Sequence, residues 1–170
     1  MNIRHIQKKN KNIPLNELTN ELTDKIIKLN TMVENYDDFK KYLKTPQQEY
    51  VETTVFYNIV FNNRFLGYSE FKEHIKPENY ILGLCDVIGE LRRIILESIK
   101  NDCVEDAKKY YEFMENIYGF IMQFDYYHVI DDLRRKQDVS RNLLEKTNSD
   151  LVNFIENLKL RNEIKRLKMK

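Results

Sequence analysis

Two pairs of acidic residues lie at helical spacing in this chain: Glu49 with Glu52, and Asp86 with Glu90. In a helix, side chains three or four positions apart are neighbours, and like charges there destabilise the helix by about 0.2–0.5 kcal/mol per pair. A divalent cation bound by carboxylate oxygens would offset that repulsion. The spacing therefore predicts either a metal site formed by four carboxylates or two acidic pairs on solvated helix faces.

Four carboxylates in one crevice would suit the hydrolysis of a phosphodiester. That reaction needs a nucleophilic water and neutralisation of the charge that develops on the phosphate oxygens, and oxygen-bound Mg²⁺ or Mn²⁺ can supply both. If the two acidic pairs lie on facing helices, their oxygens form a hard-cation site with room for water and a substrate phosphate. Mg²⁺ or Mn²⁺ is therefore the expected cofactor of such a site.

A di-iron helical bundle is the main alternative use of carboxylates on helices. Such bundles usually carry Glu-x-x-His on two helices, and neither His74 nor His128 has a Glu three residues before it. Asp125 and His128 have a suitable spacing but fall in a predicted loop. The sequence also has no phosphate-binding glycine loop, cysteine-rich zinc motif or nucleophile elbow. Oxygen ligation of a hard cation is the metal chemistry that the sequence favours.

Basic residues could hold a nucleic-acid backbone, but the formal net charge is only +1, so any basic surface must be local. Three clusters are candidates for phosphate contacts: Lys40, Lys41 and Lys44; Arg134, Arg135, Lys136 and Arg141; and the segment Lys159 to Lys170. Tyr42, Tyr126 and Tyr127 lie beside these clusters and could stack on bases. Solvated helix faces and a frayed tail are the alternative interpretation.

The elements that would position these residues are helical by pattern. A hydrophobic content of 42%, with 32% charged residues, four Gly and three Pro, is typical of a helical bundle. Apolar stripes with spacings of three and four predict long helices over residues 15–33, 80–100, 102–124 and 133–158. Gly83 and Gly89 would each destabilise a helix by about 1 kcal/mol, so we expect a neighbouring helix to approach closely at both.

The predicted organisation is an all-α, single-domain bundle of six or seven helices. The domain is expected to span residues 14–158, after a disordered basic arm (1–13) and before a basic helix end or tail (159–170). The apolar stripe of the last helix is longer than one small bundle needs, which predicts that part of it meets another subunit.

The segment that carries Glu49 and Glu52 gives conflicting signals. From Val51 to Phe61, β-branched and aromatic residues alternate with period two, which favours a strand. From Thr45 to Gln48, however, the sequence carries an N-cap Thr, a Pro at the first helical position and a capping-box Gln. We predict a helix that begins at Thr45. A strand would point Glu49 and Glu52 to opposite faces and abolish the site.

The cellular setting follows from cysteine use and from the N-terminus. Cys85 and Cys103 are too few for a disulfide framework, so we expect buried thiols in a reducing compartment. Residues 1–12 are polar and Lys-rich, without an apolar core of signal-peptide length, and no run approaches 18 apolar residues. The expectation is a soluble, cytoplasmic protein without a membrane partner.

Three blocks of the sequence resemble the translin family. Residues 80–93 (YILGLCDVIGELRR) resemble its signature helix, and residues 48–52 (QEYVE) resemble its companion acidic segment. Residues 133–151 are similar to its C-terminal helix, through the segments LRRKQDVSR (133–141), EKT (145–147) and DL (150–151). The likeness covers residues 45–152. It implies an all-helical fold, a helix at Glu49 and Glu52, and assembly into a hollow homo-octamer.

The resemblance also implies a function. Translin-family proteins bind single-stranded RNA or DNA, and a nuclease branch of the family cleaves RNA at an acidic metal site. Glu49, Glu52 and Asp86 match the catalytic acids of that branch, and Glu90 lies beside them. The family precedent also raises Lys40, Lys44, Arg92 and Arg93 as nucleic-acid contacts.

The resulting hypothesis is a Mg²⁺-dependent endoribonuclease acting on single-stranded RNA. One alternative is a translin-like protein that binds single-stranded nucleic acid without catalysis. Another is an interaction scaffold that neither binds nor cleaves nucleic acid.

Overall fold

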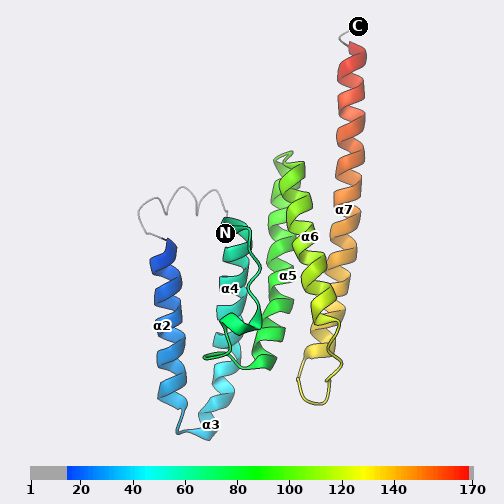
Figure 1. The fold of residues 1–170 in the computed structure, drawn as a ribbon. Coiled ribbons are helices and arrows are strands. Elements are labelled where there is room, and N and C mark those ends of the chain that lie inside the picture. Colours follow the sequence, from blue (N-terminus) through cyan, green and yellow to red (C-terminus); the bar gives the residue numbers. More distant parts are fainter. Residues whose placement is uncertain (1–14, 169–170) are drawn as a thin grey trace. The chain divides into compact units, whose positions relative to one another are not determined.

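The structure, a computed structural model, describes residues 15–168 of the 170, so the predicted N-terminal arm lies outside the described residues. The described chain is all-helical, which confirms the predicted fold class (Figure 1). Its long helices are α2 (Leu15–Val33), α4 (Lys44–Asn62), α5 (Pro77–Lys100), α6 (Val104–Ile121) and α7 (Leu133–Lys168). Three short elements, α3 (Asp37–Lys40) and the 3₁₀ turns η1 (Lys41–Leu43) and η2 (Tyr68–Glu70), lie between them.

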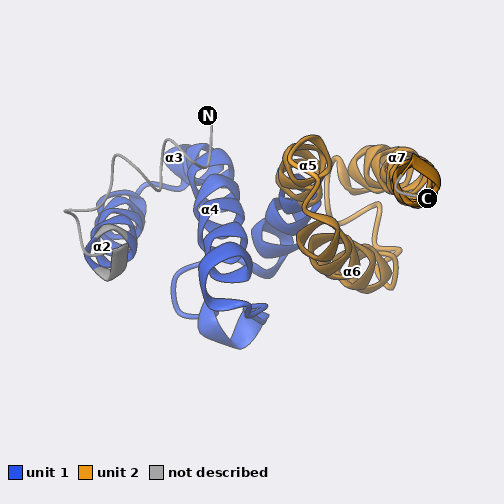
Figure 2. Ribbon diagram, turned by 90° about the horizontal axis from the view of Figure 1, so that it is seen from above, with its two compact units in different colours: residues 1–87 blue, residues 88–170 orange. Residues whose placement is uncertain are grey.

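The chain divides into two compact units, Met1–Val87 and Ile88–Lys170 (Figure 2). The first unit holds α2, α3, α4 and the beginning of α5. The second holds the rest of α5 with α6 and α7. Glu49, Glu52 and Asp86 therefore belong to the first unit, whereas Glu90 belongs to the second.

Helix α4 settles the conflict between strand and helix patterns, and the predicted helix is confirmed. Val51, Val55 and Ile59 are fully buried at spacings of four, as one face of a helix requires. Tyr57 and Phe61 stack on each other, with 4.8 Å between ring centroids. They are one turn apart, so the aromatic residues that imitated a strand pattern are partners on a helix.

The capping predicted for this helix is wrong. Helix α4 begins at Lys44, directly after η1, and Leu43 holds the N-cap position without a side-chain hydrogen bond. Thr45 and Pro46 lie in the first helical turn, where proline is tolerated because that turn's N–H groups have no intrahelical partner. The helix ends at Asn62, and the φ of 51° at its C-cap residue, Asn63, lies in the left-handed region.

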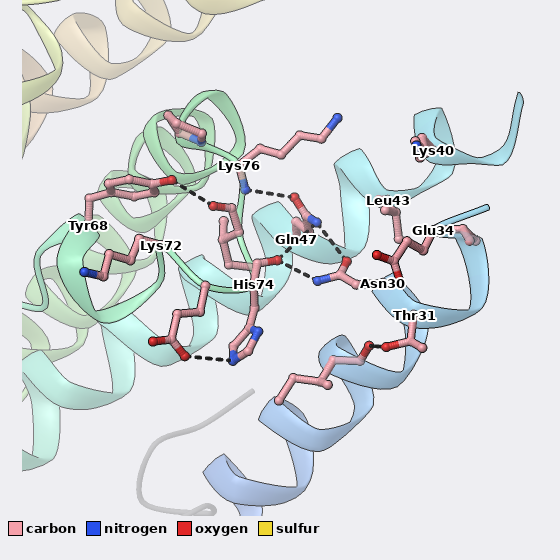
Figure 3. Close-up of a pocket in the computed structure, with 15 residues that line it drawn as sticks. Asn30, Thr31, Glu34, Lys40, Leu43, Gln47, Tyr68, Lys72, His74 and Lys76 are labelled. Carbon is pink, nitrogen blue, oxygen red and sulfur yellow. Dashed lines mark hydrogen bonds and ion pairs between the residues drawn. The ribbon is translucent and has the colours of Figure 1, made fainter. Parts of the chain in front are cut away.

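The buried side-chain amide of Gln47 joins four segments of the first unit (Figure 3). Its Nε2 donates to Asn30 Oδ1 at 3.0 Å and to the carbonyl of His74 at 3.3 Å. Its Oε1 accepts from the backbone N–H of Lys76 at 3.3 Å and from Asn79 Nδ2 at 2.7 Å. Both donors and both acceptor sites of the amide are used. The start of α4 is thereby tied to α2, to the loop before α5 and to α5 itself.

The second unit is built on the packing of α6 and α7. Ala107, Tyr110, Met114, Ile117 and Ile121 form the buried face of α6. From α7, Gln137 Nε2 donates to the carbonyls of Ile121 and Phe124, both at 2.8 Å, and so satisfies the end of α6. Helix α6 begins at Val104 rather than at the predicted Asp102, because Asp102 adopts a positive φ of 57° in the preceding turn.

Both cysteines are free thiols; Cys85 is buried as expected, whereas Cys103 is only partly buried. None of the helices between residues 15 and 168 combines the length and apolarity needed to cross a bilayer.

Gly83 and Gly89 of α5 differ in their surroundings. A Cβ built on Gly83 would lie 2.9 Å from the carbonyl oxygen of Gln48 and 2.9 Å from Cβ of Val51. The close helix approach predicted at Gly83 is therefore confirmed. The same prediction for Gly89 is wrong for the described chain, since a Cβ there would meet nothing within 4 Å.

This contrast generates a prediction for two otherwise identical substitutions. Gly83→Ala should lower the free energy of unfolding by about 1–3 kcal/mol, because the new methyl group presses on the backbone of α4. Gly89→Ala should raise it by about 0.5–1 kcal/mol, because alanine favours a helix over glycine. Urea unfolding followed by circular dichroism measures both. Equal effects of the two substitutions would contradict the α4–α5 contact described here.

Candidate catalytic and nucleic-acid-binding site

Glu52 and Asp86 both lie close to the contact between α4 and α5 at Gly83. Glu52 follows Val51, whose side chain borders Gly83, and Asp86 lies three residues, about one helical turn, after Gly83. Both carboxylates are half-buried, and both already interact with other groups of the fold. The contact at Gly83 thus fixes the backbone positions from which these two acids project.

Glu49 lies on another side of α4. Its exposed side chain borders a cavity of about 240 Å³ between α2 and α4, together with Lys25 and Tyr50. Tyr50 is itself held toward α2, because its hydroxyl hydrogen-bonds Thr23 Oγ1 at 2.8 Å. Glu49 therefore faces α2, whereas Val51, next to Glu52, faces α5.

Glu90 has a counter-charge from its own helix. It is half-buried and forms an ion pair with Arg93, three residues later on α5. The sequence argument held that Asp86 and Glu90, one turn apart, would repel each other unless a cation lay between them. Arg93 supplies positive charge at Glu90 without a metal.

Glu52 and Asp86 suit a cation that also binds water and a substrate phosphate better than they suit a metal site closed by protein ligands alone. Between residues 15 and 168, no three His, Cys, Asp or Glu side chains form a group that could hold a metal ion. The structure therefore does not gather the four predicted carboxylates, and the metal assignment stays a prediction. Glu52 and Asp86 still offer suitable oxygens, since proteins often bind Mg²⁺ through one or two carboxylates, several waters and a substrate phosphate.

Arg92, one of the predicted nucleic-acid contacts, ties two helices of the second unit together. Its Nη1 donates to Thr147 Oγ1 at 2.8 Å, and its Nη2 pairs with Asp150 Oδ2 at 2.9 Å. Its side chain is only 21% exposed, against 55% for Arg93. The geometry gives Arg92 a structural role between α5 and α7 and leaves Arg93 more accessible to a ligand.

The other residues predicted to contact nucleic acid differ in whether they already pair with groups of the protein. Lys40 Nζ pairs with Asp37 Oδ1 at 2.6 Å, and the half-buried Lys44 also has a partner. Arg135 pairs with Asp132 at 3.4 Å. Arg134 is exposed, with its guanidinium carbon 6.0 Å from the ring centroid of Tyr127. These residues remain candidates for phosphate contacts; Lys40 and Lys44 belong to the first unit, and Arg134 and Arg135 belong to the second.

Sequence reasoning missed a cavity of about 510 Å³ in the first unit (Figure 3). It lies between the end of α2, the connector to α4 and the loop before α5, so only the tertiary fold assembles it. Its charged lining residues are of both signs: Lys40, Lys72, Lys76, Glu34 and Glu73. Their charges nearly balance, so charge alone does not identify a ligand for this cavity.

Comparison with known proteins identifies similar chains. The sequence model of the Translin family matches residues 2–152. The uncharacterized protein MJ0175 of Methanocaldococcus jannaschii is 51% identical over 169 residues, which cover 99% of this chain and 75% of that protein. A structure of AfC3PO in complex with duplex RNA is 28% identical with a TM-score of 0.70, covering 84% of this chain and 75% of that one. The crystal structure of apo-NeC3PO is 27% identical with a TM-score of 0.68, covering 82% and 70%.

The different surroundings of Arg92 and Arg93 predict different effects of the same substitution. Arg92→Ala should lower the free energy of unfolding by about 1–2 kcal/mol, because it removes two hydrogen bonds between α5 and α7 and leaves Asp150 unpaired. Arg93→Ala should change it by less than about 0.5 kcal/mol, because Arg93 is 55% exposed and its ion pair with Glu90 lies within one helix. Thermal and urea unfolding of the two variants tests this. A larger loss for Arg93→Ala would contradict the assignment.

Proposed function

Because the chain belongs to the translin family, we propose that it binds RNA. The observation that carries this proposal is the neighbour of the same fold that was solved in complex with duplex RNA. The basic residues Lys41, Arg93 and Arg134 are exposed and could contact phosphates without disturbing the core. Phosphate contacts of this kind provide affinity that does not depend on base sequence.

The finer proposal is that the protein is an endoribonuclease that cleaves single-stranded RNA with Mg²⁺ or Mn²⁺. Glu52 and Asp86, which both belong to the first unit, would hold the cation. When bound, the cation supplies an activated water and neutralises charge on the scissile phosphate. The half-burial of Glu52 and Asp86 strengthens their interaction with any bound charge, because surrounding protein screens less than water does.

A non-catalytic binding protein for single-stranded RNA or DNA is the second candidate. Two observations favour it: the acidic residues do not gather into a group of three, and Arg93 already neutralises Glu90. In that case the acidic residues serve the fold alone. Binding without cleavage is then the complete activity of the isolated chain.

Substitution of the two acids separates these candidates. If the protein is a nuclease, Asp86→Asn and Glu52→Gln should each reduce cleavage of a labelled single-stranded RNA by about 100-fold or more, because each removes a charged ligand. Binding of the same RNA should change little. Glu49→Gln should cause a smaller loss, because Glu49 faces α2. Gel analysis of the products measures cleavage, and fluorescence anisotropy measures binding.

Two controls make that experiment decisive. Glu112→Gln alters an exposed acid on α6 and should leave both activities unchanged. EDTA should stop cleavage, and added Mg²⁺ or Mn²⁺ should restore it. Cleavage that survives EDTA, or a fully active Asp86→Asn variant, would overturn the carboxylate–metal mechanism. Binding of the RNA by the wild-type protein without any cleavage would leave the binding protein as the correct description.

We also propose that the chain assembles as a homo-octamer. Helix α7 supports this, because Leu160, Ile164 and Leu167 are 59%, 43% and 71% exposed at spacings of four and three. That spacing forms a stripe of the kind that packs between helices of different subunits. Leu151 and Phe154, by contrast, are buried within the second unit.

The assembly proposal predicts a mass by light scattering of eight times the 20.7 kDa chain. Changing both Leu160 and Leu167 to Asp should lower this mass while leaving the helical circular dichroism signal of the folded core intact. Asn162→Asp adds one negative charge off the stripe and is the control for the effect of charge alone. A monomeric wild-type protein at micromolar concentration would rule out the octamer.

A further inference from the structure

The connector between α2 and α4 carries three exposed aromatic residues that contact one another in series, Tyr36, Phe39 and Tyr42. Their side chains are 60%, 54% and 65% exposed. The ring centroids of Tyr36 and Phe39 are 6.2 Å apart, and those of Phe39 and Tyr42 are 6.1 Å apart. We call this set the aromatic ladder. Contiguous exposed apolar groups of this kind usually mark a binding surface.

Two lysines lie between the rings of the aromatic ladder. Lys41 Nζ lies 5.2 Å from the ring centroid of Tyr42, and Lys40 is the residue immediately before Lys41. Of the two acids in this segment, Asp37 is neutralised by Lys40 at 2.6 Å, and Asp38 is exposed. Stacking rings combined with nearby cations are the usual elements of a surface that binds single-stranded nucleic acid.

One observation favours a nucleic-acid strand over a second copy of this chain as the occupant. Lysine is depleted where proteins meet proteins, yet Lys40 and Lys41 are interleaved with the rings. The form of the strand follows from the ring planes, which meet at 87° and 44°. Bases in a duplex are parallel to one another, so rings in such different orientations suit the unstacked bases of an unpaired strand.

We propose that the aromatic ladder stacks on unpaired bases of single-stranded RNA, with Lys41 and Lys40 beside the phosphates of the same strand. This inference rests on the proposed RNA binding and adds to it a site at which the bases are held. Stacking is tolerant of sequence because every base has a π-face. The site therefore selects unpaired nucleotides over paired ones without selecting a base sequence.

The test compares two single-stranded RNA probes of about 12 nucleotides, within the range that such surfaces cover. One probe is fluorescein-labelled oligo(U), and the other has the same backbone with abasic positions. Tyr42→Ala and Phe39→Ala should each weaken binding of oligo(U) by about 5- to 100-fold, as expected for the loss of one stacked base. Neither should affect binding of the abasic strand or of duplex RNA.

Two control variants accompany these measurements. Tyr42→Phe keeps the ring and should bind oligo(U) as the wild type does. Phe65→Ala removes an exposed aromatic side chain that lies outside the aromatic ladder, and it should have no effect on the preference for oligo(U) over the abasic strand. Light scattering on every variant reports the oligomeric mass.

Each outcome decides a different question. Wild-type binding of oligo(U) that the ladder variants leave unchanged would overturn the ladder and keep the proposed RNA binding. A wild-type protein that binds no RNA would overturn both. A ladder variant that loses oligomeric mass together with binding would show that the rings form a contact between copies of the chain, which also overturns the proposal. Ladder variants that bind oligo(U) more weakly but bind the abasic strand as the wild type does would support the proposal.

Discussion

The hydrogen bonds of the Gln47 amide constrain the whole first unit. A buried amide with every donor and acceptor engaged fixes the separation and rotation of the segments that it joins, because an unmade bond there costs about 1–3 kcal/mol. Helix α4 therefore starts at a set position relative to α2 and α5. The contact at Gly83, the projection of Glu52 and Asp86, and the path of the connector with its three rings all follow from that position.

The sequence predicted those features that depend on local periodicity. Buried residues at spacings of three and four identified the long helices, and Gly83 was correctly associated with a close helix contact. The capping signal at Thr45 misled because η1 runs into α4 without the break that a cap requires. The close helix contact predicted at Gly89 was wrong, because the sequence does not show whether another helix approaches a helical glycine. The Gln47 network could not be predicted, since its partners are up to 32 positions away.

The candidate site shows why spacing identifies acidic residues better than it identifies their partners. Glu49 and Glu52 are three positions apart, yet Glu49 borders a cavity beside α2, whereas Glu52 follows Val51, which contacts α5. Rotation by about 60° around a helix is enough to move a side chain into a different groove. Arg92 and Arg93 show the same effect. Arg92 joins α5 to α7, whereas the adjacent Arg93 remains accessible to a ligand.

The length of α7 links helix formation to assembly. Its 36 residues extend for about 54 Å, twice the length of the 18-residue α6 that packs on it. Arg161 still reaches Asp102, at 2.7 Å, but the residues from Arg161 to Lys168 are exposed. A segment this short is only marginally helical in water unless other surfaces cover it. On the proposed assembly, amide hydrogen exchange in these last turns should slow as subunits join, and this end of the chain would then report the oligomeric state.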